Sequence, residues 1–244
     1  MKILRSKEYS EKLKIQPIKI SDLDDLDEHE YAWYPESRGE LIDTIEYLMS
    51  IYGPNCSLNS ICTSKIYDFH ELFKYIEPKF KGDVSKWDMS NAKTTVCMFE
   101  NCFDFNSDIS RWDVSNVEDM HGMFYNCQEF NQNLNNWNVS KVKDMSGMFN
   151  HCHNFNNPLD KWKDKLKNVK KMRQMFQDNS KFNQDLSMWD ISNVEEMDYM
   201  FSKCYELDQD FSKWNLDGKT VNAIFYDCKK MKSQNIPYKK IYNL

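Results

Sequence analysis

The side chains in this chain with the most evident chemistry are cysteines that recur at a nearly fixed step. They occupy one position of a repeated unit, which in one copy holds Asn179 instead: Cys102, Cys127, Cys152, Cys204 and Cys228. If the units stack, neighbouring cysteines lie about 5 Å apart at Cα, a separation that a disulfide permits. Cysteine is also among the most buried residue types. Because one copy accepts Asn179, we expect packed, free thiols rather than disulfides.

A metal site is conceivable at the run His151-Cys152-His153, with Cys127 one repeat earlier. The run contains no C-x-x-C or H-x-x-x-H pair, and the side chains of consecutive residues point apart. The sequence therefore favours no metal and no other cofactor.

Catalytic signatures are not found around these residues. The five histidines occupy unrelated positions of the repeat, and no Ser or Cys lies in a nucleophile-elbow or triad pattern. Paired acids such as Glu118-Asp119 lie at predicted helix starts, where the helix dipole favours them. We expect no enzymatic activity and no small-molecule substrate.

These residues belong to a repeat of about 25 residues. Tryptophans mark it at spacings of 25, 25, 25, 27 and 25: Trp87, Trp112, Trp137, Trp162, Trp189 and Trp214. In its cleanest copy, residues 117–141, the unit reads V-x-x-M-x-x-M-F-x-x-C-x-x-F-N-x-x-L-x-x-W-x-V-S-x. Repetition in phase predicts that the Trp and Met-Phe columns form the core rather than an aromatic binding groove.

The spacing within one unit predicts a short helix followed by a short strand. Apolar residues follow a helical face at Val117, Met120, Met123, Phe124 and Cys127. Ser115 and Glu118 resemble a capping box at its start. The run from Leu134 to Val139 fits a strand that pairs in parallel with the next copy. We therefore predict an α/β fold, a right-handed solenoid of about seven helix-strand coils with a helical N-terminal cap.

Three segments follow from this repeat. Residues 1–57 form an acidic leader and cap, with seven basic and twelve acidic residues (7 − 12 = −5), a solvated acidic run at 22–30 and a predicted helix over 40–49. Residues 58–231 form the solenoid, in which Ile61 takes the place of the first Trp. Residues 232–244 form a C-terminal cap or tail.

The run Phe182-Asn183-Gln184-Asp185-Leu186-Ser187-Met188-Trp189-Asp190-Ile191-Ser192-Asn193-Val194, followed by Met-Phe and Cys, resembles the repeat of BspA-like leucine-rich-repeat surface proteins. This family includes the Mycoplasma-type lipoprotein repeats and has bacterial, amoebal and giant-virus members. The resemblance covers about residues 36–231. It implies a leucine-rich-repeat-like solenoid that binds macromolecules or serves as a surface or structural component, without known catalysis.

The net charge and the lack of long apolar stretches indicate which partners and which location to expect for this protein. With 32 basic and 38 acidic residues the net charge is −6, so we do not expect a nucleic-acid partner. Residues 1–8 show no apolar signal region, and no apolar stretch approaches the roughly 20 residues that cross a bilayer. We expect no membrane span and an intracellular or virion-associated location rather than secretion.

The candidate binding surface is the outward face beside the tryptophans. Its side chains are predicted to form two columns, one mostly basic and one mostly acidic: Lys86 and Asp88, Arg111 and Asp113, Asn136 and Asn138, Lys161 and Lys163, Met188 and Asp190, Lys213 and Asn215. A solvated, self-neutralising face is the alternative interpretation. The longer copy adds a second candidate, because residues 161–173 hold seven basic residues and one acid, Asp164.

From these observations the sequence predicts a non-enzymatic protein-interaction module of the leucine-rich-repeat type. The alternative is a structural or self-assembling component of a particle or cell surface. The identity of the partner, the source organism, the oligomeric state and the role of the leader stay open.

Overall fold

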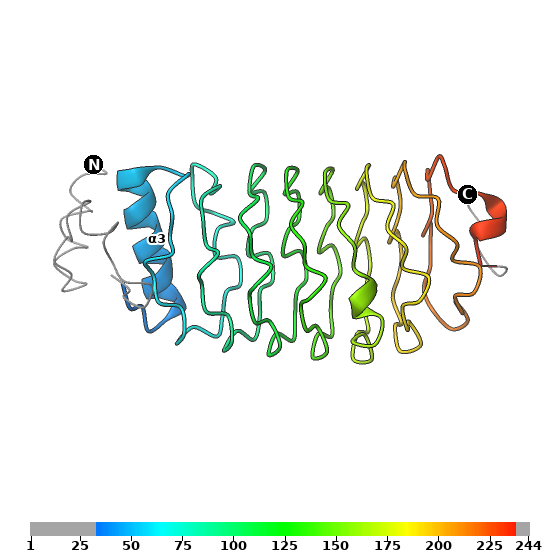
Figure 1. The fold of residues 1–244 in the computed structure, drawn as a ribbon, viewed down its shortest axis with the longest axis horizontal. Coiled ribbons are helices and arrows are strands. Elements are labelled where there is room, and N and C mark those ends of the chain that lie inside the picture. The colour runs from blue at the N-terminus through cyan, green and yellow to red at the C-terminus, as the bar shows by residue number, and fades with distance from the viewer. Residues whose placement is uncertain (1–32, 238–244) are drawn as a thin grey trace.

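A computed structural model describes residues 33–237, which form a row of similar coils stacked one on the next (Figure 1). Its helices are α3 (Arg38–Tyr52) and two 3-10 turns, η1 (Asp160–Trp162) and η2 (Ser233–Asn235). Successive coils are joined by isolated parallel bridges rather than by a sheet. Seven residues, one from each coil, form this series of bridges: Asp68, Thr94, Asp119, Asp144, Lys171, Glu196 and Thr220.

The predicted α/β solenoid of helix-strand coils is wrong. Residues 117–127 form no helix and contain consecutive turns over 121–126, and residues 134–139 form no strand. Gly122 and Asn126 adopt left-handed φ values of 59° and 60°, which a right-handed helix does not accommodate. The apolar spacing was interpreted as helical because a chain of turns closed by i to i+3 hydrogen bonds places side chains inward at similar intervals.

Backbone hydrogen bonds between coils replace the helical ones. In the third coil, the N–H groups of every second residue donate to carbonyl oxygens of the fourth coil at 2.7–3.0 Å: Met120 to Asp144, Gly122 to Ser146, Phe124 to Met148 and Asn126 to Asn150. The N–H groups between them close turns within the coil, as Met123 does on Met120 at 3.2 Å. Equivalent bonds join every pair of neighbouring coils. We call these N–H groups the donor row.

The donor row has a direction, so its two ends differ. Its last members are the N–H groups of Val221, Ala223, Phe225 and Asp227, for which residues 33–237 supply no acceptor. At the opposite end, the carbonyl oxygen of His70 accepts from the Arg38 guanidinium of α3, 2.7 Å from Nε. Within residues 33–237 the stack is therefore closed at its α3 end and ends, at the other, in donors without a described acceptor.

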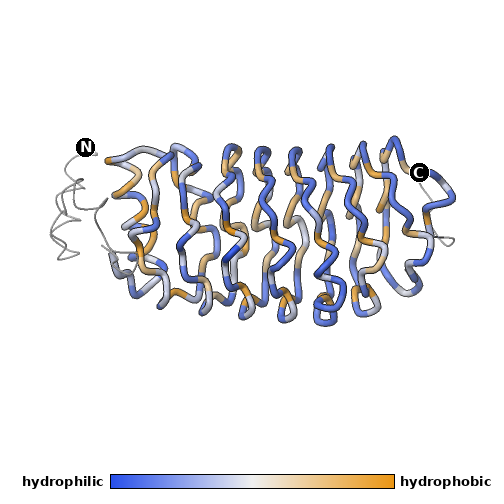
Figure 2. Tube along the Cα trace, in the orientation of Figure 1, coloured by the Kyte–Doolittle hydropathy of each residue, from blue (hydrophilic) through white to orange (hydrophobic). Residues whose placement is uncertain are grey.

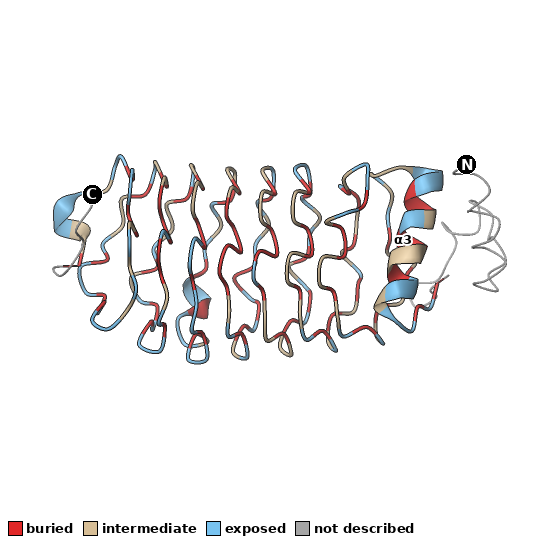
Figure 3. Cartoon of the chain, turned by 180° about the vertical axis from the view of Figure 1, so that it is seen from behind, coloured by how far each residue is buried: buried red, intermediate tan, exposed pale blue. Residues whose placement is uncertain are grey.

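Aromatic side chains inside the coils also stack from each coil to the next. One Phe column runs through the stack with ring centroids 5.1–5.8 Å apart: Phe73, Phe99, Phe124, Phe149, Phe176, Phe201 and Phe225. Apolar and buried positions recur in every coil (Figures 2 and 3). The prediction that the Trp and Met-Phe columns form the core is confirmed.

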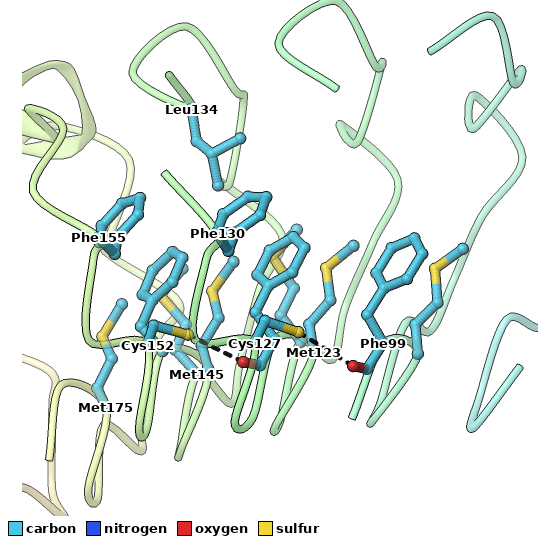
Figure 4. Close-up of a cluster of buried hydrophobic side chains, with 14 of the residues drawn as sticks. Phe99, Met123, Cys127, Phe130, Leu134, Met145, Cys152, Phe155 and Met175 are labelled. Carbon is cyan, nitrogen blue, oxygen red and sulfur yellow. Dashed lines mark hydrogen bonds between the residues drawn. The ribbon is translucent and has the colours of Figure 1, made fainter. Parts of the chain in front are cut away.

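Polar atoms in this core bond to the preceding coil. The Trp137 indole N–H donates to the carbonyl oxygen of Ile109 at 3.1 Å. The thiol of Cys127 donates to the carbonyl oxygen of Phe99 at 3.0 Å, and that of Cys152 does the same one coil later (Figure 4). The eight cysteines form no disulfide in this structure, and burial raises the pKa of Cys127. The thiol column is therefore structural, because buried thiols are poor nucleophiles.

Helix α3 covers the first coil, over the residues where the sequence predicts a helix. Ser37 caps its start by accepting the Glu40 N–H at 3.2 Å, and Gly53, with φ 79°, ends it. Leu41, Ile45 and Leu48 are buried against the coil stack. Together with the Arg38 contact, this packing fixes the closed end.

Asn179 interrupts the thiol column. Its side chain is fully buried, and neither amide atom has a hydrogen-bond partner within the described chain. A buried polar group without a partner costs about 1–3 kcal/mol. We expect Asn179→Cys to raise the free energy of unfolding by about that amount in a urea titration. The mirror variant Cys152→Asn should lower it; equal midpoints for all three proteins would contradict this account.

Gly122 occupies a donor-row position that a side chain would strain. A Cβ there lies 3.0 Å from the Cys97 sulfur, and φ is +59°. We expect Gly122→Ala to lower the free energy of unfolding by about 1–2 kcal/mol. Gly39→Ala in α3 is the control, because that Cβ meets nothing closer than 3.9 Å and alanine favours helices by up to about 1 kcal/mol. Thermal unfolding of both variants tests the pair, and equal losses would contradict it.

Candidate binding surface

The twelve residues predicted as a binding surface lie beside the stacked tryptophans. All except the half-buried Asp88 are exposed. Trp87 and Trp112 stack with ring centroids 6.5 Å apart and planes 5° from parallel. Side chains that flank them therefore repeat from coil to coil, as the contact between Lys161 Nζ and Asn136 Oδ1 at 3.0 Å shows. The two columns exist, but they run along turns rather than along strands.

The acidic column serves the local backbone. In five coils its side-chain oxygen accepts the N–H two residues later, at 2.9–3.3 Å: Asp88 from Ser90, Asp113 from Ser115, Asn138 from Ser140, Asp190 from Ser192 and Asn215 from Asp217. This is an Asx turn. Lys163, in the longer coil, is the exception. The D-x-S and N-x-S spacing was the signal that sequence reasoning missed.

The basic column makes no ion pairs within the described residues. We call Lys86, Arg111, Lys161, Lys163 and Lys213 the basic ridge. None of them has an acidic group within 4 Å among residues 33–237; exposed lysines away from the ridge include both paired and unpaired examples. Exposed cations at neighbouring coils reinforce one another's potential over about a Debye length of 8–10 Å. The ridge is therefore a strip of exposed cations on the outer face, flanked by the carboxylates of Asp88, Asp113 and Asp190.

Two uncharged positions interrupt this strip. Asn136 lies between Arg111 and Lys161, and Met188 follows Lys161 with 75% of its surface exposed. A flexible, exposed Met beside cations offers apolar contact to a partner that the lysines attract. The strip therefore combines cations that attract a partner from a distance with one flexible apolar side chain, Met188, that can contact it.

The seven basic residues of the longer coil do not form one cluster. Lys170 and Lys171 pair with Glu195 and Glu196 of the next coil at 2.9 and 3.8 Å. Arg173 lies 3.6 Å from Glu196. Lys165 turns inward and donates to the carbonyl oxygen of Trp137 at 2.9 Å. Of the original cluster, Lys161 and Lys163 remain on the ridge, with Lys167 exposed beside it.

The histidines next to Cys152 are not part of the basic ridge. His151 Nε2 is 3.4 Å from the Asp178 carboxylate, and burial lowers the pKa of His151 although that acid favours protonation. Tyr125 lies on the other side, with ring centroids 5.8 Å apart. This cluster escaped the sequence analysis because residues 26 apart form no motif. Nowhere in residues 33–237 do three His, Cys, Asp or Glu side chains come together in a way that could hold a metal ion.

These features define a repeat protein of stacked, turn-built coils with a strip of exposed cations on one face. The chain belongs to the family described as "Mycoplasma protein of unknown function, DUF285", whose model matches residues 49–162 and 134–238. No curated protein and no solved structure matches the chain. Among the helices described, none has the length and apolar character to cross a membrane.

The Asx turns predict a defined response to acid. Hydrogen bonds from Ser115 lower the pKa of Asp113 below its ordinary value of 3.8, and those from Ser192 do the same for Asp190. A lowered pKa means that these carboxylates stabilise the fold above pH 4 and that this stabilisation is lost as the pH falls. We expect Asp113→Asn with Asp190→Asn to make the free energy of unfolding less sensitive to pH between about pH 5 and pH 2.

Asparagine is the suitable substitute because Asn138 and Asn215 make the same turn. The control Asp113→Ala with Asp190→Ala removes the acceptor and should lower stability at every pH. Denaturant titrations at each pH measure both effects. If the asparagine variant loses stability with acid as steeply as the original protein, the carboxylates do not act in this way.

Proposed function

We propose that this chain is a non-enzymatic protein-interaction module, related through its repeat sequence to the BspA-like leucine-rich-repeat surface proteins. The basic ridge is the binding surface, and its partner presents an acidic surface. The observation that supports this proposal is a row of exposed cations on successive coils that make no ion pair among residues 33–237. Such a row favours association with an acidic surface.

Rigidity supports the same function. The coils that carry the ridge are fixed by the donor row and by the Asx turns, so the cations keep their spacing before a partner arrives. Pre-organisation lowers the entropic cost of binding. The charges contribute mainly to association rate and specificity, and the exposed Met188 contributes contact area.

The test is charge reversal on the ridge. We expect the triple variant Lys86→Glu, Arg111→Glu and Lys161→Glu to lose a partner that the original protein captures from its native source. Lys93→Glu, Lys181→Glu and Lys229→Glu change the charge equally at exposed positions away from the ridge. Quantitative mass spectrometry compares the three captures. A partner retained equally by both triple variants, or lost equally by both, would exclude the ridge.

A second candidate function is end-to-end assembly into a structural component. Of the nine exposed large apolar residues within 33–237, seven lie near the two ends of the stack: Tyr34, Ile51, Tyr52, Tyr67 and Tyr75 near α3, and Tyr199 and Tyr226 near the last members of the donor row. Sedimentation at increasing protein concentration tests this candidate. Concentration-dependent growth that Tyr199→Ser with Tyr226→Ser abolishes would favour assembly over the binding module.

A further inference from the structure

A second exposed surface of the stack is built from uncharged side-chain amides. One column contains the Asn that follows Phe105 and its equivalents in three further coils: Asn106, Asn131, Asn156 and Asn183. The Oδ1 atom of each Asn accepts the backbone N–H at the equivalent position of the next coil, at 2.9–3.0 Å. These hydrogen bonds connect the column along the stack, and the last of them comes from the N–H of Asp208.

A second column of amides lies beside the first. Each member donates from its side-chain nitrogen to the backbone oxygen and to Oδ1 of the Asn one coil earlier, at 2.7–3.0 Å: Gln132, Asn157, Gln184 and Gln209. Every Oδ1 of the first column therefore accepts two hydrogen bonds from the next coil. Because an amide group is planar, these bonds also fix the direction of its Nδ2 atom. We call the two columns together the amide ladder.

The amide ladder leaves half of its hydrogen-bonding groups unused. Within residues 33–237, the Nδ2 atoms of the first column donate to no acceptor, and the side-chain oxygens of the second column accept from no donor. Three of the four Asn in the first column are exposed, and the unused atoms of the half-buried members are not buried. The ladder therefore presents a row of oriented donors beside a row of acceptors.

The spacing of the amide ladder selects the kind of polymer that fits it. Neighbouring coils repeat about every 4.8 Å, so the four donors span roughly 14 Å. Side chains on one side of an extended polypeptide repeat about every 6.6 Å, and they fall out of step with the coils. The phosphates of one strand of duplex DNA advance by about 3.4 Å. The hexose units of an extended, β-1,4-linked glycan advance by nearly one coil each. Of these polymers, the glycan alone stays in register.

The charge beside the amide ladder favours a neutral glycan over an acidic one. The residues two positions from the Asn of the first column include one cation, Lys181, and four exposed acids: Asp104, Asp108, Glu129 and Asp185. These carboxylates repel glycans that carry uronic acids or sulfate groups, but they can accept hydrogen bonds from neutral hydroxyls.

We propose that the amide ladder binds a neutral, extended, β-1,4-linked glycan whose chain lies along the axis of the stack. One hexose lies against each coil, where a hydroxyl accepts a hydrogen bond from an Asn Nδ2 and donates one to the amide oxygen beside it. The amide ladder holds these groups in place before the glycan arrives, which lowers the entropic cost of binding. The site is separate from the basic ridge and does not rest on the proposed function.

Titration of the full chain with the β-1,4-linked hexamers of glucose, mannose and N-acetylglucosamine tests the site. The side-chain amide signals in NMR spectra report on each Asn directly. We expect at least one hexamer to shift the signals of the first column saturably and to leave those of Asn138 and Asn215 unchanged. The α-1,4-linked hexamer of glucose, whose chain curves away from a straight row, should shift none of them.

The variant Asn131→Asp with Asn156→Asp removes two donors and keeps the oxygen atoms that accept the internal hydrogen bonds. Asp208 takes this position in the following coil, where its Oδ1 accepts from Asn235 at 3.2 Å, so a carboxylate fits there. We expect the affinity for the bound hexamer to fall by about tenfold or more, because two hydrogen bonds are lost. The midpoint of urea unfolding should change little.

The matched control is Asn138→Asp with Asn215→Asp, at positions that hold Asp113 and Asp190 in other coils. It adds the same charge outside the amide ladder and should bind the hexamer as tightly as the original protein does. Equal weakening in both double variants overturns the proposal. An absence of saturable shifts with all three β-linked hexamers overturns it as well.

The ridge variant Lys86→Glu, Arg111→Glu and Lys161→Glu separates this site from the proposed function. We expect it to bind the hexamer with unchanged affinity, whether or not it captures a protein partner. A loss of hexamer binding in this variant places the glycan on the basic ridge and overturns the proposal.

Discussion

The structure depends on one set of interactions, the hydrogen bonds that run from each coil to the next through every second backbone N–H. Each coil alone contains only a few turns, and it leaves these donors without acceptors. Stacking satisfies them and brings the Phe and Trp columns into contact at the same time. The fold is therefore cooperative along its axis, and the burial of polar backbone is inseparable from the burial of apolar side chains.

The sequence predicted what is buried better than how the chain is bent. Trp137 and Phe124 recur in phase, and repetition alone is enough to place them in a shared core. The conformation of residues 117–127 depends on two left-handed residues per coil, Gly122 and Asn126 in the cleanest copy. Only some copies mark those positions with Gly or Asn, so the apolar spacing outweighed them in the prediction. The helix α3 was predicted from the amphipathic pattern of residues 40–49 and the stop signal Gly53-Pro54.

The sequence likewise predicted part of the binding surface and missed another part. Residues next to a buried Trp are expected to face outward, and Lys86 and Arg111 do. The D-x-S spacing around Asp113 was a local signal of its turn, whereas sequence proximity could not reveal that Lys170 pairs with an acid 25 residues away. Charge content along the chain is therefore a poor guide to the charges that lack a partner in the structure.

The direction of the donor row gives the stack an electrical polarity. The peptide groups of the donor row point the same way in successive coils and outnumber those, such as Glu118 and Glu129, whose N–H groups donate to the preceding coil, so the donor row leaves partial positive charge at Val221 to Asp227 and partial negative charge at His70. The Arg38 guanidinium sits on the negative pole, where a cation is stabilised. A further coil could therefore hydrogen-bond to the donor-row N–H groups at Val221 to Asp227. It could not do so at the other end, where α3 and Arg38 already cover the stack.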